Sequence, residues 1–528
     1  QFRIERKQGD NGSWGHIKTV SADVTTYTDT TLAGDATYWY RVYAYDATGQ
    51  SAYSNEDGIT TAVETDGGPI YTDDPKTAYI SPLDDTDEYT GRGVFWVPAN
   101  ARWSFLAENA KGLVPSMDGP EKSIGALIDE AMDAVMQANP QLSGTLPRIF
   151  NRDNVDQRRL GELIDLLNSA RFAAQGQGGS DGRRARDLLG EVYEYFLEKF
   201  AAAEGKRGGE FYTPAGVVRV LVELLQPTRG RVYDPCCGSG GMFVQAEKFI
   251  DAHHGEGSDI SVYGQELNER TWRMAKMNLA IHGLSGNLGP RWGDTFARDL
   301  HPDVQADFVM ANPPFNIKDW ARSEDDPRWR FGVPPAGNAN YAWIQHYLHH
   351  LAPRGMAGIV MSNGSLSTTR KEEKVIREGI IADDKLDCVI MLPDKLFTNT
   401  GISACLWVLV NDKADPRFRD RRGETLFIDC RGMGQMSSRT LREMAAEDLD
   451  KIAGAYQSWR SKDDFDSYAD ERGFCKAVTT AGEIAEHGDI IVPGRYVGAP
   501  PLPDDGEPFE EKIRQLRGRL NAEFAESS

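Results

Sequence analysis

The sequence has few cysteines and lacks the residue patterns that usually hold structural metals. Six cysteines occur among 528 residues, with no Cys-x-x-Cys pair and no histidine at zinc-finger spacing. These absences argue against a disulfide framework and against structural zinc, so no metal ligand is predicted. The adjacent Cys236 and Cys237 are interpreted as two small buried side chains.

Long apolar runs are also missing. No stretch approaches the roughly 20 apolar residues that a membrane-spanning helix needs, so no membrane contact is predicted. The chain begins at Gln1 and has no charged-then-apolar signal segment. A fragment or a processed product is therefore the expectation.

Basic residues are outnumbered, because 59 Lys and Arg stand against 80 Asp and Glu, a net charge of −21. Affinity for nucleic acid comes largely from Lys and Arg at phosphates, so this balance argues against a strong independent grip on DNA. The net charge is −9 over residues 1–100 but only −3 over residues 201–400. The middle of the chain thus leaves room for a local basic face.

The composition is otherwise that of a globular protein, with 40% hydrophobic and 26% charged residues, and the length predicts two to four domains. Residues 1–62 show the alternation of half-buried strands. They resemble an incomplete fibronectin type III domain, with Tyr38 at the position of its corner tyrosine. Residues 63–91 are rich in Asp, Thr, Gly and Pro without periodicity, which predicts a linker.

Helical periodicity predicts an α-helical domain over residues 92–204. Over residues 205–485, short β-branched runs alternate with amphipathic helices. This alternation predicts an α/β fold: a doubly wound, Rossmann-like sheet that binds ligands at the carboxyl ends of its strands. The predicted strands are 231–234, 261–265, 306–311, 357–362, 386–392, 404–410 and 425–429, and the predicted helices lie near 241–254, 268–283, 339–352 and 371–381.

Residues 486–528 form a predicted tail that contains one amphipathic helix from Glu507 to Ser528. Its apolar face either packs on its own domain or binds a partner protein. The sequence favours neither alternative.

The end of the first predicted strand of the sheet is rich in glycine. Asp234 precedes a loop that contains Gly238, Ser239, Gly240 and Gly241 and leads into a helix. Glycines let the backbone approach a ligand closely, and the start of a helix offers free N–H groups. Because Asp234 would repel a phosphate, the loop suits an ammonium or sulfonium ligand with an amino-acid tail.

Acidic residues also follow the next two strands. Glu266 ends the second strand, where a carboxylate beside the glycine loop can accept hydrogen bonds from ribose hydroxyls. Alternatively, this segment caps the following helix through Asn268. Asp294 follows an expected third strand and is a candidate contact for the adenine edge of the same cofactor.

The most specific pattern is Asn312-Pro313-Pro314-Phe315, directly after the apolar strand that ends at Ala311. The prolines remove two N–H donors and leave the Asn312 amide and carbonyl oxygens above the sheet. If the Asn312 side-chain oxygen and the Pro313 carbonyl accept the two hydrogens of a planar amine, its nitrogen becomes pyramidal and nucleophilic. Phe315 offers an apolar face on which the ring can stack.

Together, the glycine loop and the Asn-Pro-Pro-Phe turn resemble amino-group methyltransferases that use S-adenosylmethionine. The segment Glu210-Phe211-Tyr212-Thr213-Pro214 is similar to the signature of the modification subunit of type I restriction-modification systems. The similarity extends from about Trp96 to the end of the chain. It implies that the backbone of this segment and the Thr213 hydroxyl contact the methionine part of the cofactor. The alternative is a helix start, with Thr213 as N-cap and Pro214 as the first helical residue.

The resemblance implies a cytoplasmic enzyme that transfers a methyl group from S-adenosylmethionine to N6 of a flipped-out adenine in DNA, without a covalent enzyme intermediate. It further implies a separate specificity subunit that reads the DNA, and it allows a nuclease subunit and a second copy of the chain. The chain departs from the family where its helical domain starts late and where it ends at Ser528.

Other functions stay open at this stage. Enzymes that methylate protein glutamine or RNA bases also use an Asn-Pro-Pro-aromatic turn. The fibronectin-like segment is compatible with a non-catalytic binding or adhesion protein.

Overall fold

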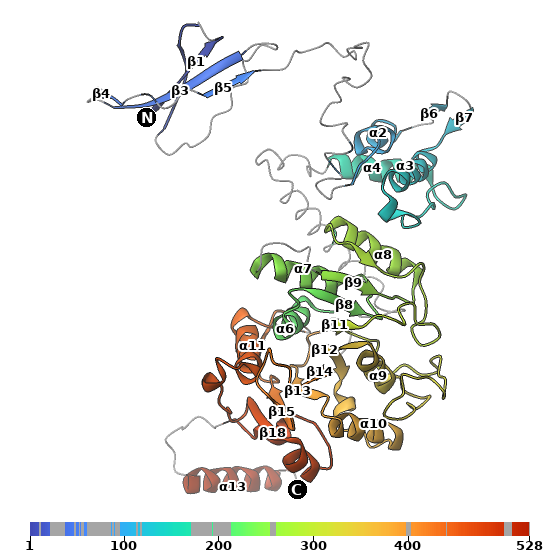
Figure 1. The fold of residues 1–528 in the computed structure, drawn as a ribbon, viewed down its shortest axis with the longest axis vertical. Helices are drawn as coiled ribbons and strands as arrows, with labels where there is room; N and C mark the ends of the chain where they lie inside the picture. The colour runs from blue at the N-terminus through green and yellow to red at the C-terminus, as the bar shows by residue number, and fades with distance from the viewer. Residues whose placement is uncertain are drawn as a thin grey trace. The chain divides into compact units, whose positions relative to one another are not determined.

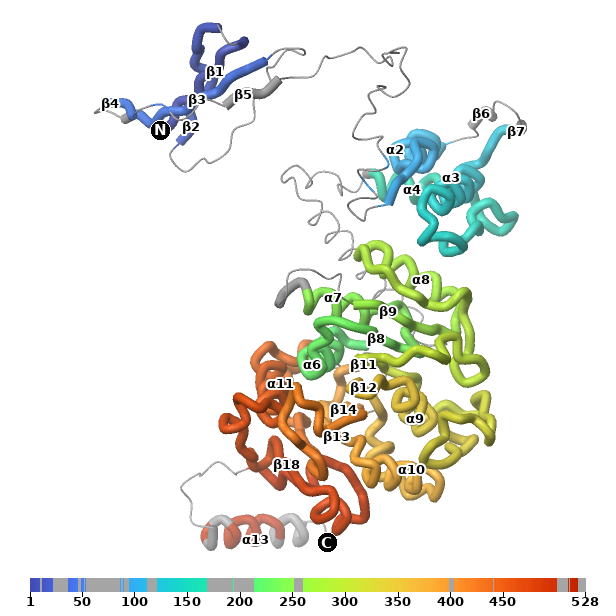
Figure 2. Tube along the Cα trace, in the orientation of Figure 1, coloured from blue at the N-terminus to red at the C-terminus, as the bar shows by residue number. Residues whose placement is uncertain are grey.

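The structure is a computed structural model of the full chain, drawn as a ribbon in Figure 1 and as a Cα tube in Figure 2. The described residues are 1–9, 12–21, 37–46, 49–51, 53, 57–60, 86, 89, 95–111, 114–116, 119–169, 193, 213–253, 260–397, 403–439, 441–500 and 509–526. The chain divides into two compact units, Gln1–Glu88 and Tyr89–Ser528.

The first unit contains an antiparallel sheet. Strands β2, β1, β3 and β4 are neighbours in that order, and β5 also pairs with β3. Among the described residues of this unit, the side chains of Ile4, Tyr38 and Tyr43 are buried. The resemblance to fibronectin type III and the boundary at residue 62 stay predictions. The strands are β1 (Phe2–Gln8), β2 (Gly15–Val20), β3 (Thr37–Asp46), β4 (Gly49–Gln50) and β5 (Asp57–Thr60).

The second unit begins with a small helical segment. Its core cluster includes Leu106, Leu127 and Ile164, and α3 is capped by Ser123, whose Oγ accepts a hydrogen bond from the Ala126 N–H. The predicted limits 92–204 stay a prediction, because most of residues 170–212 lie outside the described residues. Its elements are η1 (Ala99–Ala101), α2 (Trp103–Glu108), β6 (Val114–Ser116), β7 (Gly119–Lys122), α3 (Ile124–Ala138), η2 (Pro140–Leu142) and α4 (Gln157–Ser169).

A nine-stranded sheet forms the centre of the second unit, in the order β10-β9-β8-β11-β12-β14-β13-β15-β18. The first five strands are parallel, whereas β14 is antiparallel to both of its neighbours and β18 is antiparallel to β15. The predicted doubly wound sheet is confirmed, but it is mixed. The strands are β8 (Gly230–Asp234), β9 (Ile260–Gly264), β10 (Gly286–Asn287), β11 (Ala306–Ala311), β12 (Leu351–Ser362), β13 (Leu386–Met391), β14 (Ala404–Val410), β15 (Glu424–Asp429) and β18 (Cys475–Thr479).

Helices cover both faces of this sheet. Successive residues of β11 enter different core clusters: Met310 packs with α6, α7, α8 and α11, whereas Val309 packs with α9, α10 and α12 (Figure 1). This alternation is the period-2 geometry of a strand that is buried on both sides. The helices are α6 (Ala215–Leu225), α7 (Gly241–His253), α8 (Glu269–Ile281), α9 (Asn340–His350), α10 (Lys371–Ala382), α11 (Ala446–Arg460) and α12 (Gly494–Val497).

Shorter elements and a final helix complete the unit. The C-terminal helix α13 spans Phe509–Glu526, as predicted, and its Ile513, Leu516 and Leu520 side chains are about half exposed. No helix in the described part of the chain is both long and apolar enough to cross a membrane. The shorter elements are η4 (Asn363–Leu366), β16 (Gln435–Met436), β17 (Arg442–Glu443), η5 (Phe465–Ser467) and the π-helical turn η6 (Thr480–Ile484).

Candidate active site

Two neighbouring parallel strands bring the glycine loop and the Asn-Pro-Pro-Phe turn to the same edge of the sheet. β8 ends at Asp234 and β11 ends at Ala311, and Val309 pairs with Tyr233 in the ladder between them. Adjacent strands lie about 4.8 Å apart, so Asn312 leaves the sheet directly beside the start of the glycine loop. The two patterns therefore face one ligand region, although they lie 71 positions apart, counted from Gly241 to Asn312.

The glycine loop has the backbone of a ligand cradle. Gly238 and Gly240 have φ values of +54° and +77°, which L side chains rarely adopt. A Cβ atom at Gly238 or Gly241 would meet no other atom within 4 Å, whereas one at Gly240 would lie 3.6 Å from Ala275. Gly240 thus packs against α8, and the space above Gly238 and Gly241, at the start of α7, is open to a ligand.

Asp234 is a buried carboxyl group at the base of this cradle, with only 2% of its surface exposed. Its Oδ1 accepts hydrogen bonds from the Cys236 N–H at 3.0 Å and from Cys236 Sγ at 3.4 Å. Burial raises the pKa of Asp234 to about 7, a shift that the Cys236 hydrogen bonds oppose and the charge of Glu266 reinforces. A cation beside Asp234 would therefore stabilise its ionised form strongly.

Glu266 joins the cradle to the next helix. Its Oε2 accepts from the Gly238 N–H at 3.0 Å, and its Oε1 accepts from the Asn268 N–H at 2.7 Å. Asn268 is the N-cap of α8, since its Oδ1 accepts from the N–H groups of Arg270 and Thr271. The capping interpretation of this segment is confirmed, and the contact between Glu266 and a ribose stays a proposal.

The loop that contains Asp294 is bound to both preceding strand ends. The Gly293 N–H donates to the Glu266 carbonyl at 2.8 Å, and Thr295 Oγ1 donates to the Pro235 carbonyl at 2.6 Å. Asp294 Oδ1 accepts from the Phe296 and Ala297 N–H groups, at 2.8 and 3.3 Å. Asp294 therefore organises its own loop at the edge of the site.

Two exposed apolar side chains flank this region, and the sequence analysis missed both. Leu267, which follows Glu266, is 58% exposed, and Trp292, which precedes Gly293, is 39% exposed. The Gly293–Glu266 hydrogen bond brings their two chain segments together. For Leu267, the sequence signal that would have found it is an apolar residue directly after the acidic residue that follows a strand.

The side-chain amide of Asn312 has a hydrogen-bond partner at its nitrogen but none among the described residues at its oxygen. Its Nδ2 donates to Thr213 Oγ1 at 2.9 Å, which holds the amide in one orientation. Its Oδ1 is buried and has no hydrogen-bond donor among the described residues. A buried acceptor without a donor is costly, so this oxygen suits a ligand N–H.

The predicted N-cap role of Thr213 is wrong. Pro214 itself is the N-cap of α6, which begins at Ala215, and its side chain makes no capping hydrogen bond. The Thr213 hydroxyl instead accepts from Asn312, 99 positions away. This pairing satisfies the amide N–H, which a local helix-start pattern does not reveal. Glu210, Phe211 and Tyr212, the other predicted residues of this segment, lie outside the described residues.

The remaining residues of the turn form its apolar wall. Pro313 is buried, Pro314 is half-buried, and Phe315 is half-buried against the core cluster that contains Met310. The stacking role predicted for Phe315 stays a proposal. Ser239 is half-buried, and its backbone carbonyl accepts from Asn278 Nδ2 at 2.9 Å, which ties the cradle to α8.

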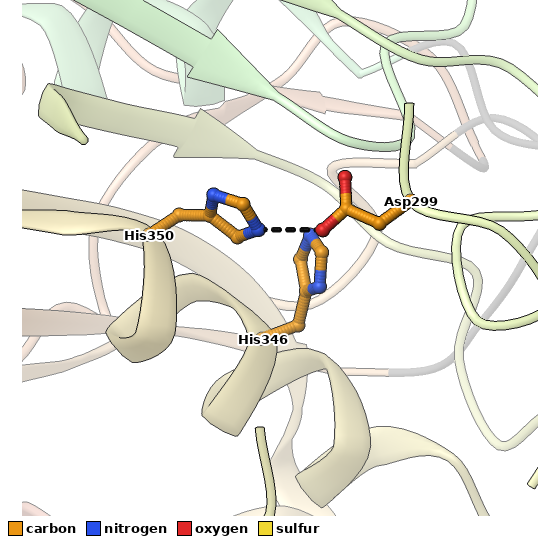
Figure 3. A group of neighbouring side chains, drawn as sticks. All are labelled: Asp299, His346 and His350. Atoms are coloured by element: carbon orange, nitrogen blue, oxygen red, sulfur yellow. Dashed lines mark hydrogen bonds and ion pairs between the residues drawn. The ribbon is translucent and has the colours of Figure 1, made fainter. Parts of the chain in front are cut away.

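A cluster of titratable side chains is formed by Asp299, His346 and His350 (Figure 3). His350 Nε2 is 2.8 Å from Asp299 Oδ2, and His350 Nδ1 is 2.9 Å from the Val304 carbonyl. The Val304 carbonyl and the Asp299 carboxylate are both hydrogen-bond acceptors, and they hold the His350 ring between them.

The fold is that of a Rossmann-like methyltransferase, with the glycine loop and the Asn-Pro-Pro-Phe turn at the ends of two neighbouring strands. A family model described as N-6 DNA Methylase matches residues 184–505. The chain is 44% identical over 439 residues to the Type I restriction enzyme HindI methylase subunit of Haemophilus influenzae, covering 82% of this chain and 96% of that one. It is 35% identical to the MjaIX methylase subunit of Methanocaldococcus jannaschii, covering 89% and 81%.

Solved structures agree in fold. The type I restriction-modification methyltransferase subunit from Streptococcus thermophilus superposes with a TM-score of 0.62 at 24% identity, covering 77% of this chain and 82% of that one. The chain belongs to the N-6 DNA methylase family, as a methylase subunit of the type I restriction-modification class. It is an enzyme that methylates N6 of adenine in DNA.

Proposed function

We propose that the methyl donor is S-adenosylmethionine, held by the Asp234 cradle, and that Asn312 activates the target amine. The observation that carries this proposal is the Asn312 Oδ1 atom, a buried acceptor without a donor among the described residues, at the strand end next to the cradle. When bound, the cofactor supplies an electrophilic methyl group on a positively charged sulfur.

Different residues of the cradle bind different parts of the cofactor. Asp234 balances the positive charge of the donor, and the open space at Gly238 and Gly241 accommodates its amino-acid part. Glu266 accepts from the ribose hydroxyls, because each carboxylate oxygen can accept more than one hydrogen bond. The exposed Leu267 side chain offers an apolar face to the adenine ring.

The Asn-Pro-Pro-Phe turn prepares the target base. Asn312 Oδ1 and the Pro313 carbonyl would accept the two N6 hydrogens, so that the N6 lone pair is withdrawn from the ring and becomes nucleophilic. The bound cofactor would supply the methyl group to this nitrogen, and the surplus N6 proton would leave to solvent. Phe315 stacks on the flipped adenine.

Thr213 orients this acceptor. We expect Thr213→Val to lower kcat about tenfold, because the Asn312 amide loses its Nδ2 partner and can rotate its oxygen away. Thr213→Ser keeps the hydroxyl and is the matched control, with kcat close to that of the unmodified enzyme. Steady-state kinetics with saturating DNA measure both variants, and equal kcat values for the two would contradict the orienting role.

The proposal includes partner proteins and a cytoplasmic location, next to the DNA. With a net charge of −21, the chain is expected to need a specificity subunit for tight DNA binding. The proposed assembly also allows a nuclease subunit and a second copy of the chain. The half-exposed apolar face of α13 is the proposed contact for such a partner.

The deciding experiment supplies cofactor with a labelled methyl group and unmodified DNA, with and without a cognate specificity subunit. We expect label on adenine N6 only when both proteins are present. Label on RNA or protein instead, or tight sequence-specific DNA binding by the isolated chain in a gel shift, would overturn the proposal.

A further inference from the structure

Arg328 is a buried arginine, with only 7% of its surface exposed. All three of its guanidinium nitrogens donate hydrogen bonds. Nη1 donates to the Thr295 carbonyl at 2.9 Å and to His346 Nδ1 at 3.1 Å. Nη2 donates to the Phe296 carbonyl at 3.0 Å, and Nε and Nη2 both pair with the Asp326 carboxylate. The planar fork of arginine is the side chain that can make this set of contacts.

Arg328 and the two carbonyls that it binds come from two chain segments, each of which adjoins residues of the proposed site. Thr295 and Phe296 directly follow Asp294, in the loop that Thr295 Oγ1 ties to the Pro235 carbonyl of the cradle segment. Arg328 itself lies in the segment that runs from the catalytic turn 312–315 into α9. One side chain thus connects the cofactor half to the target-base half.

Aromatic packing keeps this connection rigid. The Phe296 ring lies 4.3 Å from that of Trp343 and 4.9 Å from that of Trp320, measured between centroids. The Arg328 guanidinium carbon lies 5.3 Å from the centroid of Trp329 and 5.7 Å from that of Phe296. Buried aromatic side chains around the fork leave little freedom for a shorter or non-planar cation.

His346 is a neutral hydrogen-bond acceptor for Nη1 of the Arg328 guanidinium. Its Nδ1 accepts from Arg328, so its Nε2 carries the proton and donates to the Tyr233 hydroxyl at 3.0 Å. Burial lowers the pKa of His346 well below its usual value, and the neighbouring His350 lowers it further. Figure 3 shows His346 beside the Asp299–His350 pair, whose carboxylate belongs to the same loop as Thr295.

We infer that Arg328 is a positioning residue that couples cofactor binding to the geometry of the target-base turn. It fixes the Thr295 and Phe296 carbonyls relative to the segment that follows Asn312. This inference rests on the proposed function, because it takes the Asp294 loop as part of the cofactor site. Loss of the hydrogen bonds from the Arg328 guanidinium should weaken cofactor binding. It should also displace the 312–315 turn, which lowers kcat.

The test is Arg328→Lys, which keeps the charge near Asp326 but cannot bridge both carbonyls and His346. We expect about tenfold weaker binding of S-adenosylmethionine by calorimetry on the chain, and a kcat of the assembled complex lower by about tenfold or more. Arg330→Lys is the matched control, since Arg330 is exposed, pairs with Asp383 and lies over the Phe331 ring. It should match the unmodified protein in both measurements.

Two further variants keep the inference testable if the lysine variant does not fold. His346→Asn retains an acceptor near the position of Nδ1 and should restore most of the affinity and kcat that His346→Leu loses. A purely structural role of His346 would make both variants equally poor. Unchanged affinity and unchanged kcat in Arg328→Lys or His346→Leu would overturn the inference, whereas an unmodified chain that binds no S-adenosylmethionine would refute the proposed function instead.

Discussion

Replacing Asn312 with alanine is expected to reduce methyl transfer by about a thousandfold while leaving cofactor affinity within about twofold. The variant lacks the acceptor that draws the N6 lone pair out of the adenine ring. It leaves the backbone of the glycine loop and the Asp234 carboxyl unchanged, because Asn312 bonds through its side chain to Thr213 alone among the described residues. Single-turnover kinetics in the assembled complex give the transfer rate, and calorimetry gives the affinity.

Two controls separate chemistry from folding in this experiment. Asn312→Asp keeps an acceptor oxygen but loses the N–H that Thr213 accepts, so we expect intermediate activity. Asn151→Ala removes an exposed asparagine of the helical segment and should leave both measurements unchanged. Turnover near the unmodified rate in Asn312→Ala would reject the role assigned to this side chain.

Replacing Asp234 with asparagine is expected to abolish cofactor binding and, at the same time, to stabilise the cofactor-free protein. The amide keeps an oxygen that can accept from Cys236, but it has no negative charge to offer a cationic donor. It also removes the cost of burying an ionised carboxylate. A rise in pKa from 3.8 to about 7 corresponds to a cost on the order of 4 kcal/mol above pH 7.

The sign of the pH dependence follows from the same shift. Between about pH 4 and pH 7 the folded chain holds the Asp234 proton and the unfolded chain does not, so the free energy of unfolding falls as the pH rises through this window. The asparagine side chain of the variant does not titrate. The stability advantage of Asp234→Asn should therefore be small at pH 4, grow toward pH 7 and then level off.

Cofactor binding should show the opposite trend in the unmodified chain. Below about pH 7 a proton must leave Asp234 before the cation binds, so affinity is expected to fall by up to about tenfold per pH unit on acidification. Thermal melting of both proteins without cofactor at pH 5 and pH 8, with calorimetry over the same range, measures these effects. A variant that is less stable than the unmodified chain at pH 8 would contradict the proposed burial cost.

Local patterns in the sequence predicted most elements of the sheet correctly. The limits of β11 and β14 match the predicted 306–311 and 404–410 residue for residue, because short runs of apolar residues between turns are strong strand signals. The sequence did not predict that β14 runs antiparallel to β12, or that β18 closes the sheet. Strand direction depends on partners far along the chain, and no local pattern encodes it.

For the candidate site too, the sequence predicted single residues but not the contacts between distant segments. Asp234, Glu266 and Asn312 were found because each lies at or just after the end of a strand, where side chains project from the sheet edge. The Thr213–Asn312 hydrogen bond, the exposed Leu267 and Trp292 side chains and the hydrogen bonds that converge on Arg328 were not. These contacts join segments that are adjacent only after folding.

The amino-acid sequence by itself determined the chemistry of this protein: a glycine bend behind an aspartate, and an asparagine before two prolines that remove competing donors. Only the tertiary structure decided that these groups meet. Pairing of β8 with β11 places both strand ends at one edge, and burial there gives Asp234 its raised pKa and leaves Asn312 Oδ1 without a donor among the described residues. Dehydration and proximity are properties of the packed chain, because they depend on which distant segments exclude water from a group.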